Sequence, residues 1–308
     1  LENLLKTAKE DTNKVKLLTE IYWKYYYNNK KEIAIEYCIR AVELSKKIKY
    51  LKGETNILYD LGWIYWRLDE YSKALNYSEE GLEIAKFNND KNSIASFYWL
   101  IGNLHRYKGD YPLALDYEFK SLKIMKEIGN KDDFADVLNA IGVIYKYQKE
   151  YKKSLEYFLK SLNIKEEIGS KSDLGVILGT VGVGYKKLGE YDEALNYFNK
   201  SLEINQESNN RKGQAISFNC IGSIYEEKGE YKKALEYYKK ALNIDKEINS
   251  KLGIAISLQY IAQIYRKTKE YDRSINYGLQ GFNAVYTINN ISWIHSACQL
   301  LAENYATV

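Results

Sequence analysis

The sequence of 308 residues contains one proline, one methionine, two histidines and three cysteines. A single proline and few long polar runs argue against disorder. The cysteines, Cys38, Cys220 and Cys298, show no metal-ligand spacing and are odd in number, so we expect neither a metal site nor a disulfide framework. No apolar run approaches the length that spans a bilayer, and no signal peptide is recognisable, so no membrane insertion of this segment is expected.

The charge is almost balanced, which limits the classes of partner. There are 45 basic and 41 acidic residues, giving a net charge of +4. This balance is too even to indicate binding to nucleic acid or to an anionic membrane. Blocks that look basic, such as YKKALEYYKKAL, have acidic residues close by, which is typical of a solvated helix face. We therefore expect no nucleic-acid partner.

The sequence is rich in tyrosine, and its tyrosines mark a repeat. From Tyr71 to Tyr271 a tyrosine recurs every 40 residues, followed three positions later by a small residue and three further on by another tyrosine. A fixed period of this size indicates a stacked array of supersecondary units. We predict one array over residues 1–308, with approximate repeats 11–50, 51–90, 91–130, 131–170, 171–210, 211–250 and 251–290 and a half-repeat 291–308.

Each repeat is predicted to form two amphipathic helices. In residues 131–170 the apolar residues recur mostly at spacings of three and four, with helix ends near Asn130/Lys131 and Glu150/Tyr151. Three glycines stand where a first helix should end and would allow the left-handed closing conformation. They are Gly109, Gly189 and Gly229.

A second set of glycines lies in the middle of the first helices, at Gly62, Gly102, Gly142, Gly182 and Gly222. Glycine inside a helix costs up to about 1 kcal/mol relative to alanine. Its recurrence at one register indicates a close approach between helices. We expect the small residue of the second helix, such as Ala74 or Ser154, to supply the complementary groove.

These residues resemble the tetratricopeptide repeat family. The pattern Leu-Gly-x-x-Tyr, then Ala-x-x-x-Phe and a small residue, is matched by Ile141-Gly142…Tyr145, Ser154, Phe158 and Ser161. The repeat is 40 residues long and lacks the closing proline, which is similar to the long-repeat class of kinesin light chains, Leu-Gly-Asn-type adaptors and bacterial signalling proteins. The resemblance implies an all-α, right-handed superhelix of antiparallel helix pairs that holds a protein or peptide.

No catalytic constellation is recognisable, so we do not expect an enzyme, and we expect no cofactor and no metal site. His105 replaces the repeating tyrosine, which indicates a packing role, and His295 has no plausible partner. The paired carboxylates Asp132-Asp133 and Glu226-Glu227 are adjacent in sequence and therefore do not share one helix face. Phosphate-loop and nucleophile-elbow motifs are also lacking.

The resemblance also implies a binding surface, because this family presents the first helix of each repeat along a concave groove. Four of the five tryptophans fall on it, and they are surplus to the core pattern; clustered exposed aromatics mark contact surfaces. The alternative is that they are core residues. The candidate ligand-binding residues are Trp23, Tyr59, Trp63, Trp66, Trp99, Asn103, Arg106, Asn139, Lys146, Lys186, Asn219, Gln259, Gln263 and Arg266.

The amides among these candidates suit capture of a peptide main chain, because an amide both donates and accepts hydrogen bonds. In the long-repeat adaptors that this chain resembles, asparagines at such positions bind an extended peptide. The alternative for Asn139 and Asn219 is a polar, solvated face. The predicted function is protein or peptide binding within a larger bacterial signalling protein, and the alternatives are an assembly scaffold or a small-molecule or peptide-pheromone sensor.

The ends of the chain lead to further expectations. It begins at Leu1 and stops at Val308, partway through a repeat, so we expect a piece of a longer protein. A last helix over about 291–306 should expose some of Ile294, Cys298 and Leu301, and self-association through this uncapped helix is one outcome. The compartment stays open, because the resemblance favours an exported sensor region whereas unpaired cysteines favour a reducing environment.

Overall fold

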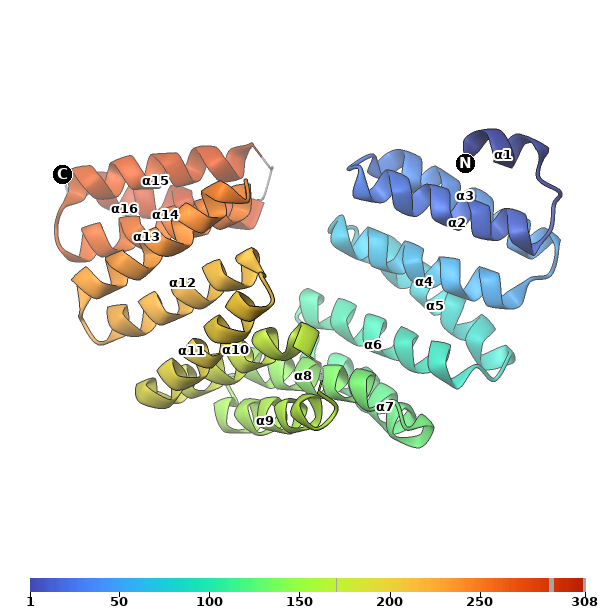
Figure 1. Ribbon diagram of the computed structural model, residues 1–308, viewed down its shortest axis with the longest axis horizontal. Coiled ribbons are helices and arrows are strands. Elements are labelled where there is room, and N and C mark those ends of the chain that lie inside the picture. Colours follow the sequence, from blue (N-terminus) through green and yellow to red (C-terminus); the bar gives the residue numbers. More distant parts are fainter. Residues whose placement is uncertain (170, 288–290, 307–308) are drawn as a thin grey trace. The chain divides into compact units, whose positions relative to one another are not determined.

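The structure, a computed structural model, describes residues 1–169, 171–287 and 291–306, and it divides the chain into two compact units, residues 1–149 and 150–308. The described residues form sixteen α-helices and no strand (Figure 1). Consecutive helices pack against each other in pairs. The prediction of an all-α solenoid of helix pairs is therefore confirmed.

Unit 1 (residues 1–149) begins with the short helix α1 (Glu2–Thr7). The first helices of its successive pairs are α2 (Thr12–Tyr27), α4 (Leu51–Arg67), α6 (Lys91–Lys108) and α8 (Lys131–Tyr147). The second helices are α3 (Lys31–Lys47), α5 (Tyr71–Phe87) and α7 (Tyr111–Ile128).

Unit 2 (residues 150–308) begins with the second helix α9 (Tyr151–Glu167). Its first helices are α10 (Lys171–Leu188), α12 (Arg211–Glu227), α14 (Lys251–Lys267) and α16 (Ile291–Tyr305), and its other second helices are α11 (Tyr191–Glu207), α13 (Tyr231–Glu247) and α15 (Tyr271–Tyr286). The helix starts predicted at Lys131 and Tyr151 are confirmed.

The turns explain this regular spacing. Side chains of Asp90, Asn130, Asn210 and Ser250 cap first helices by accepting a hydrogen bond from the backbone N–H three residues later. Residues in the left-handed conformation end the helices at 20-residue intervals from Asn29 to Lys269. The three glycines predicted there have φ values of 81°, 80° and 75°, which confirms their role.

Four of the five repeated glycines lie at close helix contacts, as predicted. A Cβ on the glycine would fall too near the side chain sixteen residues later in the second helix of the same pair. These distances are 2.5 Å from Gly62 to Ser78 Oγ, 3.0 Å from Gly102 to Glu118 Oε1, 2.6 Å from Gly182 to Phe198 Cε1 and 2.7 Å from Gly222 to Tyr238 Cε1. The predicted small partner contributes less: the Ala74 carbonyl oxygen lies 3.4 Å from a Cβ on Gly62.

The first helices form one layer within each unit. Contacts join α2 to α4, α4 to α6 and α6 to α8 in unit 1, and α10 to α12, α12 to α14 and α14 to α16 in unit 2. No comparable row of contacts joins the second helices of the described residues. The first helices of neighbouring pairs therefore lie closer to one another than the second helices do. The sides of the first helices that point away from the second helices form the inner surface of each unit.

Helix α16, the first helix of the incomplete last repeat, was predicted over about 291–306 and spans Ile291–Tyr305. Cys298 is exposed, whereas Leu301 is buried and its Cδ2 atom would lie 3.0 Å from a Cβ on Gly278. The exposed side of this helix thus includes Cys298 and excludes Leu301. Self-association through α16 stays a prediction.

The glycine register can be tested with two matched substitutions. Gly222→Ala should lower the free energy of unfolding by roughly 1–3 kcal/mol, because its Cβ would overlap the buried Tyr238 ring. Gly179→Ala should instead raise it by up to about 1 kcal/mol, because a Cβ there meets only Ser201 Oγ at 3.6 Å and alanine favours helix. Urea unfolding of both variants measures the sign of each change in the free energy of unfolding. Equal changes in the two variants would show that Gly222 is not at a close contact.

Candidate functional site

An aromatic face lies on the first helices of unit 1; we define it as Trp23, Tyr26, Trp63, Trp66 and Trp99. The Trp23 and Trp63 ring centroids are 6.0 Å apart, those of Tyr26 and Trp63 are 5.6 Å apart, and those of Trp66 and Trp99 are 6.1 Å apart, all edge to face. Such arrangements are favourable for aromatic pairs. The rings therefore support one another across three successive first helices.

These rings are half-buried, so the face is neither core nor fully solvated. They pack onto the hydrophobic core of unit 1 with one side. Arg67 lies over the Trp63 ring at 5.7 Å, and the Trp66 ring also contacts Tyr107 at 5.6 Å. Tyr107 is itself 51% exposed and carries Arg106 over its ring at 4.3 Å. A cationic, aromatic surface thus continues beyond the tryptophans.

A half-buried carboxylate, that of Asp60, supports this face from below. Tyr22, which is fully buried, donates its hydroxyl hydrogen bond to Asp60 on α4. Burial raises the pKa of Asp60 to about 6, and hydrogen bonds from the Tyr22 and Trp23 side chains partly oppose that shift. Because Trp23 contacts Trp63, Asp60 helps to fix the orientation of the aromatic face.

Asn103 and Arg106, two predicted ligand residues, are joined to a buried acid. The Asn103 side-chain nitrogen donates to the Trp99 carbonyl oxygen at 2.9 Å and to Glu118 Oε1 at 3.1 Å, and Arg106 donates to Asn103 Oδ1 at 2.9 Å. Asn103 is only 4% exposed. Burial raises the pKa of Glu118 well above its usual range. Asn103 therefore serves as an internal link that holds Arg106.

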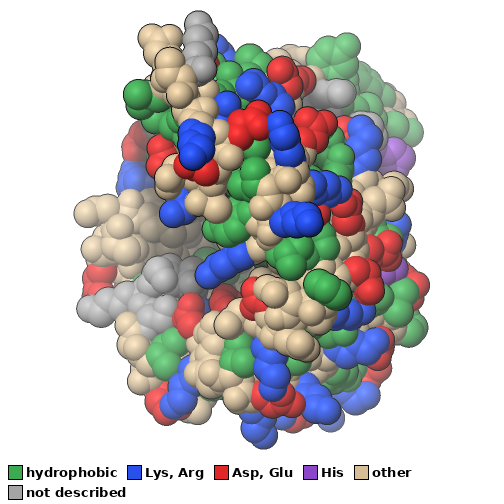
Figure 2. All heavy atoms as spheres, turned by 90° about the vertical axis from the view of Figure 1, so that its right-hand side faces the viewer, with side chains coloured by type: hydrophobic (Ala, Val, Ile, Leu, Met, Phe, Trp, Pro, Cys, Tyr) green, Lys and Arg blue, Asp and Glu red, His purple; other side chains and the backbone are tan. Residues whose placement is uncertain are grey.

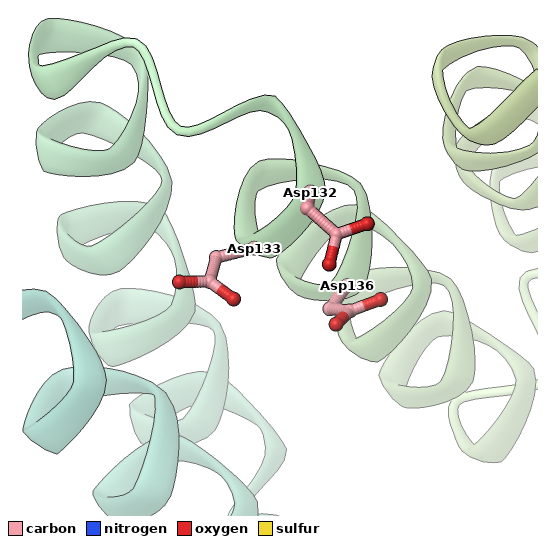
Figure 3. Close-up of side chains that lie close together, drawn as sticks. All are labelled: Asp132, Asp133 and Asp136. Atoms are coloured by element: carbon pink, nitrogen blue, oxygen red, sulfur yellow. The ribbon is translucent and has the colours of Figure 1, made fainter. Parts of the chain in front are cut away.

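Tyr59 and Trp99 line a cavity of about 150 Å³ in unit 1, together with Met125, Asp133 and Asp136. The neighbouring carboxylates of Asp132, Asp133 and Asp136 lie within 4.8 Å of one another and project from the first two turns of α8 (Figure 3). Acidic side chains at a helix N-terminus are stabilised by the helix dipole. Asp133 also accepts a hydrogen bond of 2.6 Å from the Asn130 side chain, so helix capping accounts for this cluster without a metal ion.

The remaining candidates of unit 1, Asn139 and Lys146, also lie on α8 and are half-buried. The Lys146 ammonium nitrogen lies 5.0 Å from the centroid of the Tyr147 ring. Both residues make interactions within the protein. Their role toward a ligand stays a prediction.

In unit 2 the structure brings three of the five candidates together. Lys186, Asn219 and Gln263 line one cavity of about 630 Å³ among α10, α12 and α14. The Asn219 amide donates to Ser257 Oγ at 3.1 Å, and that hydroxyl lies 3.2 Å from Asp245 Oδ2. Part of the hydrogen-bonding capacity of Asn219 is therefore already used inside the protein.

The other two candidates of unit 2 contact α16. Gln259 is 6% exposed and donates a hydrogen bond to Ser296. Arg266 forms an ion pair of 2.8 Å with Glu303. These side chains connect α14 to the last helix, and they do not line the cavity of about 630 Å³ that Lys186, Asn219 and Gln263 share.

Charges of both signs mix over the surface. On the face shown in Figure 2, Lys and Arg side chains alternate with Asp and Glu side chains and with hydrophobic ones. Many of the described charges form exposed ion pairs, such as Lys46–Glu80 at 2.7 Å and Lys120–Asp116 at 2.6 Å. None of the described helices has the length and apolar character that a membrane span requires.

The sequence matches the family model described as Tetratricopeptide repeat over residues 25–86, 133–207 and 213–285, which is more than half of the chain. The chain therefore belongs to the tetratricopeptide repeat family, as the resemblance implied. Repeats of this family are, in general, protein-interaction modules. No curated protein sequence matched this chain.

Solved structures share the fold. The apo form of RapI superposes with a TM-score of 0.73 at 18% identity, covering 89% of this chain and 98% of that one. A Rap protein complexed with Competence and Sporulation Factor gives 0.68 at 15% identity, covering 96% and 87%. A Signal Transduction ATPase with Numerous Domains from Pyrococcus horikoshii, which has a tetratricopeptide repeat sensor, gives 0.69 at 19% identity, covering 95% of this chain and 44% of that one. Identities this low show the fold alone.

The sequence did not single out two acids that the structure places beneath the surface, the buried Glu118 and the half-buried Asp60. Glu118 occupies the position that is aromatic in Phe158, Phe198 and Tyr238, and Asp60 occupies the register of Leu100 and Tyr260. Each acid stands at a repeat position that is mostly apolar in the other repeats, and this difference could have marked both residues in the sequence. Neither residue could be assigned a partner without the structure, because Tyr22 lies 38 residues from Asp60 in the sequence.

Asp60 makes a pH-dependence prediction possible. Its pKa is near 3.8 in the unfolded chain and about 6 in the fold, so the folded state binds more protons between these values. The free energy of unfolding contributed by Asp60 should therefore be highest below about pH 4 and decrease as the pH rises through 6. Urea unfolding of the wild type and of Asp60→Asn between pH 4 and 8 gives this contribution as their difference; a difference independent of pH would contradict it.

Proposed function

We propose that this chain is a protein- or peptide-binding module that holds its partner against the first helices, and that it is the sensor or interaction region of a larger bacterial signalling protein. The observation that carries the proposal is the aromatic face of unit 1. Its four tryptophans are half-buried and contact one another in pairs along neighbouring helices. Tryptophan, tyrosine and arginine are enriched among the few residues that dominate the binding energy of protein interfaces.

The face is also prepared for binding. Because Asp60, Asn103 and Glu118 fix the groups beneath it, little side-chain entropy remains to be lost when a ligand binds. Apolar side chains of an extended peptide would contact the tryptophans. Arg106, which is held at the edge by Asn103, would bind a main-chain carbonyl or an acidic group.

The shared fold supports this proposal. One solved structure of the same fold is described as a Rap protein complexed with Competence and Sporulation Factor, and another as a protein whose tetratricopeptide repeats form a sensor. The first description names a complex with a factor, and the second names a sensor made of such repeats. We infer the same general role for this chain and no catalytic one.

The alternative function is an assembly scaffold, in which convex or terminal surfaces mediate contacts. Under that function the aromatic face would only stabilise the fold. The two functions differ in the effect of replacing the tryptophans by alanine. A binding module would lose affinity for its partner, whereas a scaffold would keep it.

We expect that replacing Trp63 and Trp99 together by alanine weakens binding by at least roughly 2 kcal/mol, the scale of an interface hot spot. Helicity should be unchanged, because both rings lie on the outer side of the core. We also expect the affinity to depend only weakly on salt concentration, since charges of both signs are mixed over the surface. The partner is recovered from the native source and titrated against wild type and the double variant by calorimetry.

A matched control is Phe87→Ala, which removes a ring that is 81% exposed on the second helix α5. It should leave the affinity unchanged. Equal affinities of the wild type and the Trp63/Trp99 variant would move the site off the aromatic face and favour the scaffold.

A further inference from the structure

The cavity of about 630 Å³ in unit 2 is separate in its chemistry from the aromatic face of unit 1. Its volume falls in the range of about 300–1,000 Å³ that is usual for ligand sites. Its walls include Val183, Ile256 and Tyr260, and its rim carries Ile216, which is 54% exposed, and Leu252, which is 37% exposed. An apolar group that entered would cover these aliphatic side chains and gain hydrophobic stabilisation.

The floor of the cavity is held rigidly. The Tyr238 hydroxyl donates to Glu226 Oε2 at 2.6 Å, and the rings of Tyr238 and Tyr260 stack with their centroids 5.1 Å apart. Glu226 also pairs with Lys267 at 2.7 Å. Its carboxylate is therefore already neutralised and hydrogen-bonded, so it offers little to a cationic ligand.

Lys186, unlike Glu226, has no close partner of opposite charge among the described residues. Its side chain is only 23% exposed, and its nearest acidic partner, Glu227 Oε1, lies 3.8 Å away, beyond hydrogen-bonding distance. It donates no hydrogen bond to another described residue. Burial lowers the pKa of Lys186, which is a sign that its ammonium group is incompletely solvated. An ammonium group offers three donors, and one negatively charged acceptor would satisfy it best.

The charges around Lys186 limit what that acceptor can be. Glu227 lines the same cavity 3.8 Å from the Lys186 ammonium, so a doubly charged group such as a phosphate monoester would be repelled more strongly than a singly charged one. Lys187 and Lys212 also line the cavity, but both are exposed, and solvent screens their charges. A single carboxylate carries one charge and matches the one half-buried ammonium. The apolar walls require that this carboxylate be attached to, or stand beside, an apolar group.

We propose that this cavity of unit 2 binds an acidic side chain of a peptide, with its carboxylate on Lys186 and a neighbouring bulky apolar side chain against Ile216, Ile256 and Tyr260. This inference rests on the proposed function in taking a peptide as the ligand. It adds a specificity that the aromatic face does not supply: a preference for Asp or Glu next to a large aliphatic or aromatic residue.

The test uses the full chain and two capped nine-residue peptide libraries, acetylated and amidated at their ends. One carries a fixed central glutamate and the other a fixed central glutamine, each flanked by leucine, isoleucine or phenylalanine. Fluorescence anisotropy should show that the glutamate library binds at least tenfold more tightly. This comparison needs no substitution in the protein, so it does not depend on a variant that folds.

Variants then locate the effect. Lys186→Gln should remove the preference for glutamate, whereas Lys186→Arg should keep it within about threefold. Lys187→Gln is the matched control, since Lys187 is exposed beside the same cavity, and it should retain the preference. Ile216→Asn should weaken both libraries at least tenfold, whereas Leu279→Asn, which changes a 42% exposed leucine on α15, should weaken neither.

Several outcomes would overturn the inference. Equal binding of the two libraries, or a preference that survives Lys186→Gln, would show that Lys186 does not select an acid. Glutamate selection that appears only with an uncapped C-terminus would assign Lys186 to a terminal carboxylate instead. If the Trp63/Trp99 variant loses its partner while Lys186→Gln changes nothing, this inference fails and the proposed function stands; the reverse result keeps the cavity and rejects the aromatic face.

Discussion

The close approach of two helices within each pair is the constraint on which the rest of the structure depends. At several of these contacts one residue is small and the other fills the space: Gly222 faces Tyr238 and Gly182 faces Phe198. The first pair reverses the arrangement, since the buried Tyr22 stands at the glycine register and the buried Cys38 opposite it. Because the interior is close-packed, either helix can supply the larger side chain, and where both residues are small, as at Gly62 and Ser78, Leu100 of the next first helix lies 3.1 Å from a Cβ on the glycine.

This exchange of volumes also explains how polar groups enter the core. Tyr22 and Tyr238 each bring a hydroxyl into a buried site, and each donates it to a carboxylate, Asp60 and Glu226. A buried hydroxyl without a partner would cost stability, so each tyrosine needs an acceptor, and in both places that acceptor is an acid. The carboxylates then lie directly beneath the inner surface, where Asp60 supports Trp23 in unit 1 and Glu226 borders the cavity of unit 2.

The sequence alone was sufficient to predict the structural features that recur in every repeat. Helix starts, the left-handed glycines and the contacts of the glycine register follow from local propensities repeated many times. It also predicted that His105 packs in place of a tyrosine, and the His105 ring stacks on Tyr117 at 5.7 Å. It could not show that Lys149 and Lys269 adopt the left-handed conformation without glycine, because the surrounding turn imposes that conformation on them. Nor could it show that Asn103 and Gln259 are buried, since their partners Glu118 and Ser296 lie on other helices.

The distinction between repeated and unrepeated residues carries over to function. Stacked tyrosine pairs recur in both units, as at Tyr65–Tyr77 and Tyr225–Tyr237, where the centroids are 5.4 Å apart, and they maintain the pairs. A residue that recurs in every repeat cannot select a partner at one place. Selection must come from positions where the repeats differ, and on the first helices one such register reads Trp63, Asn103, Val143, Val183, Ser223 and Gln263. The aromatic face and the cavity with Lys186 both arise from such differences, so the regular solenoid can present two chemically different surfaces.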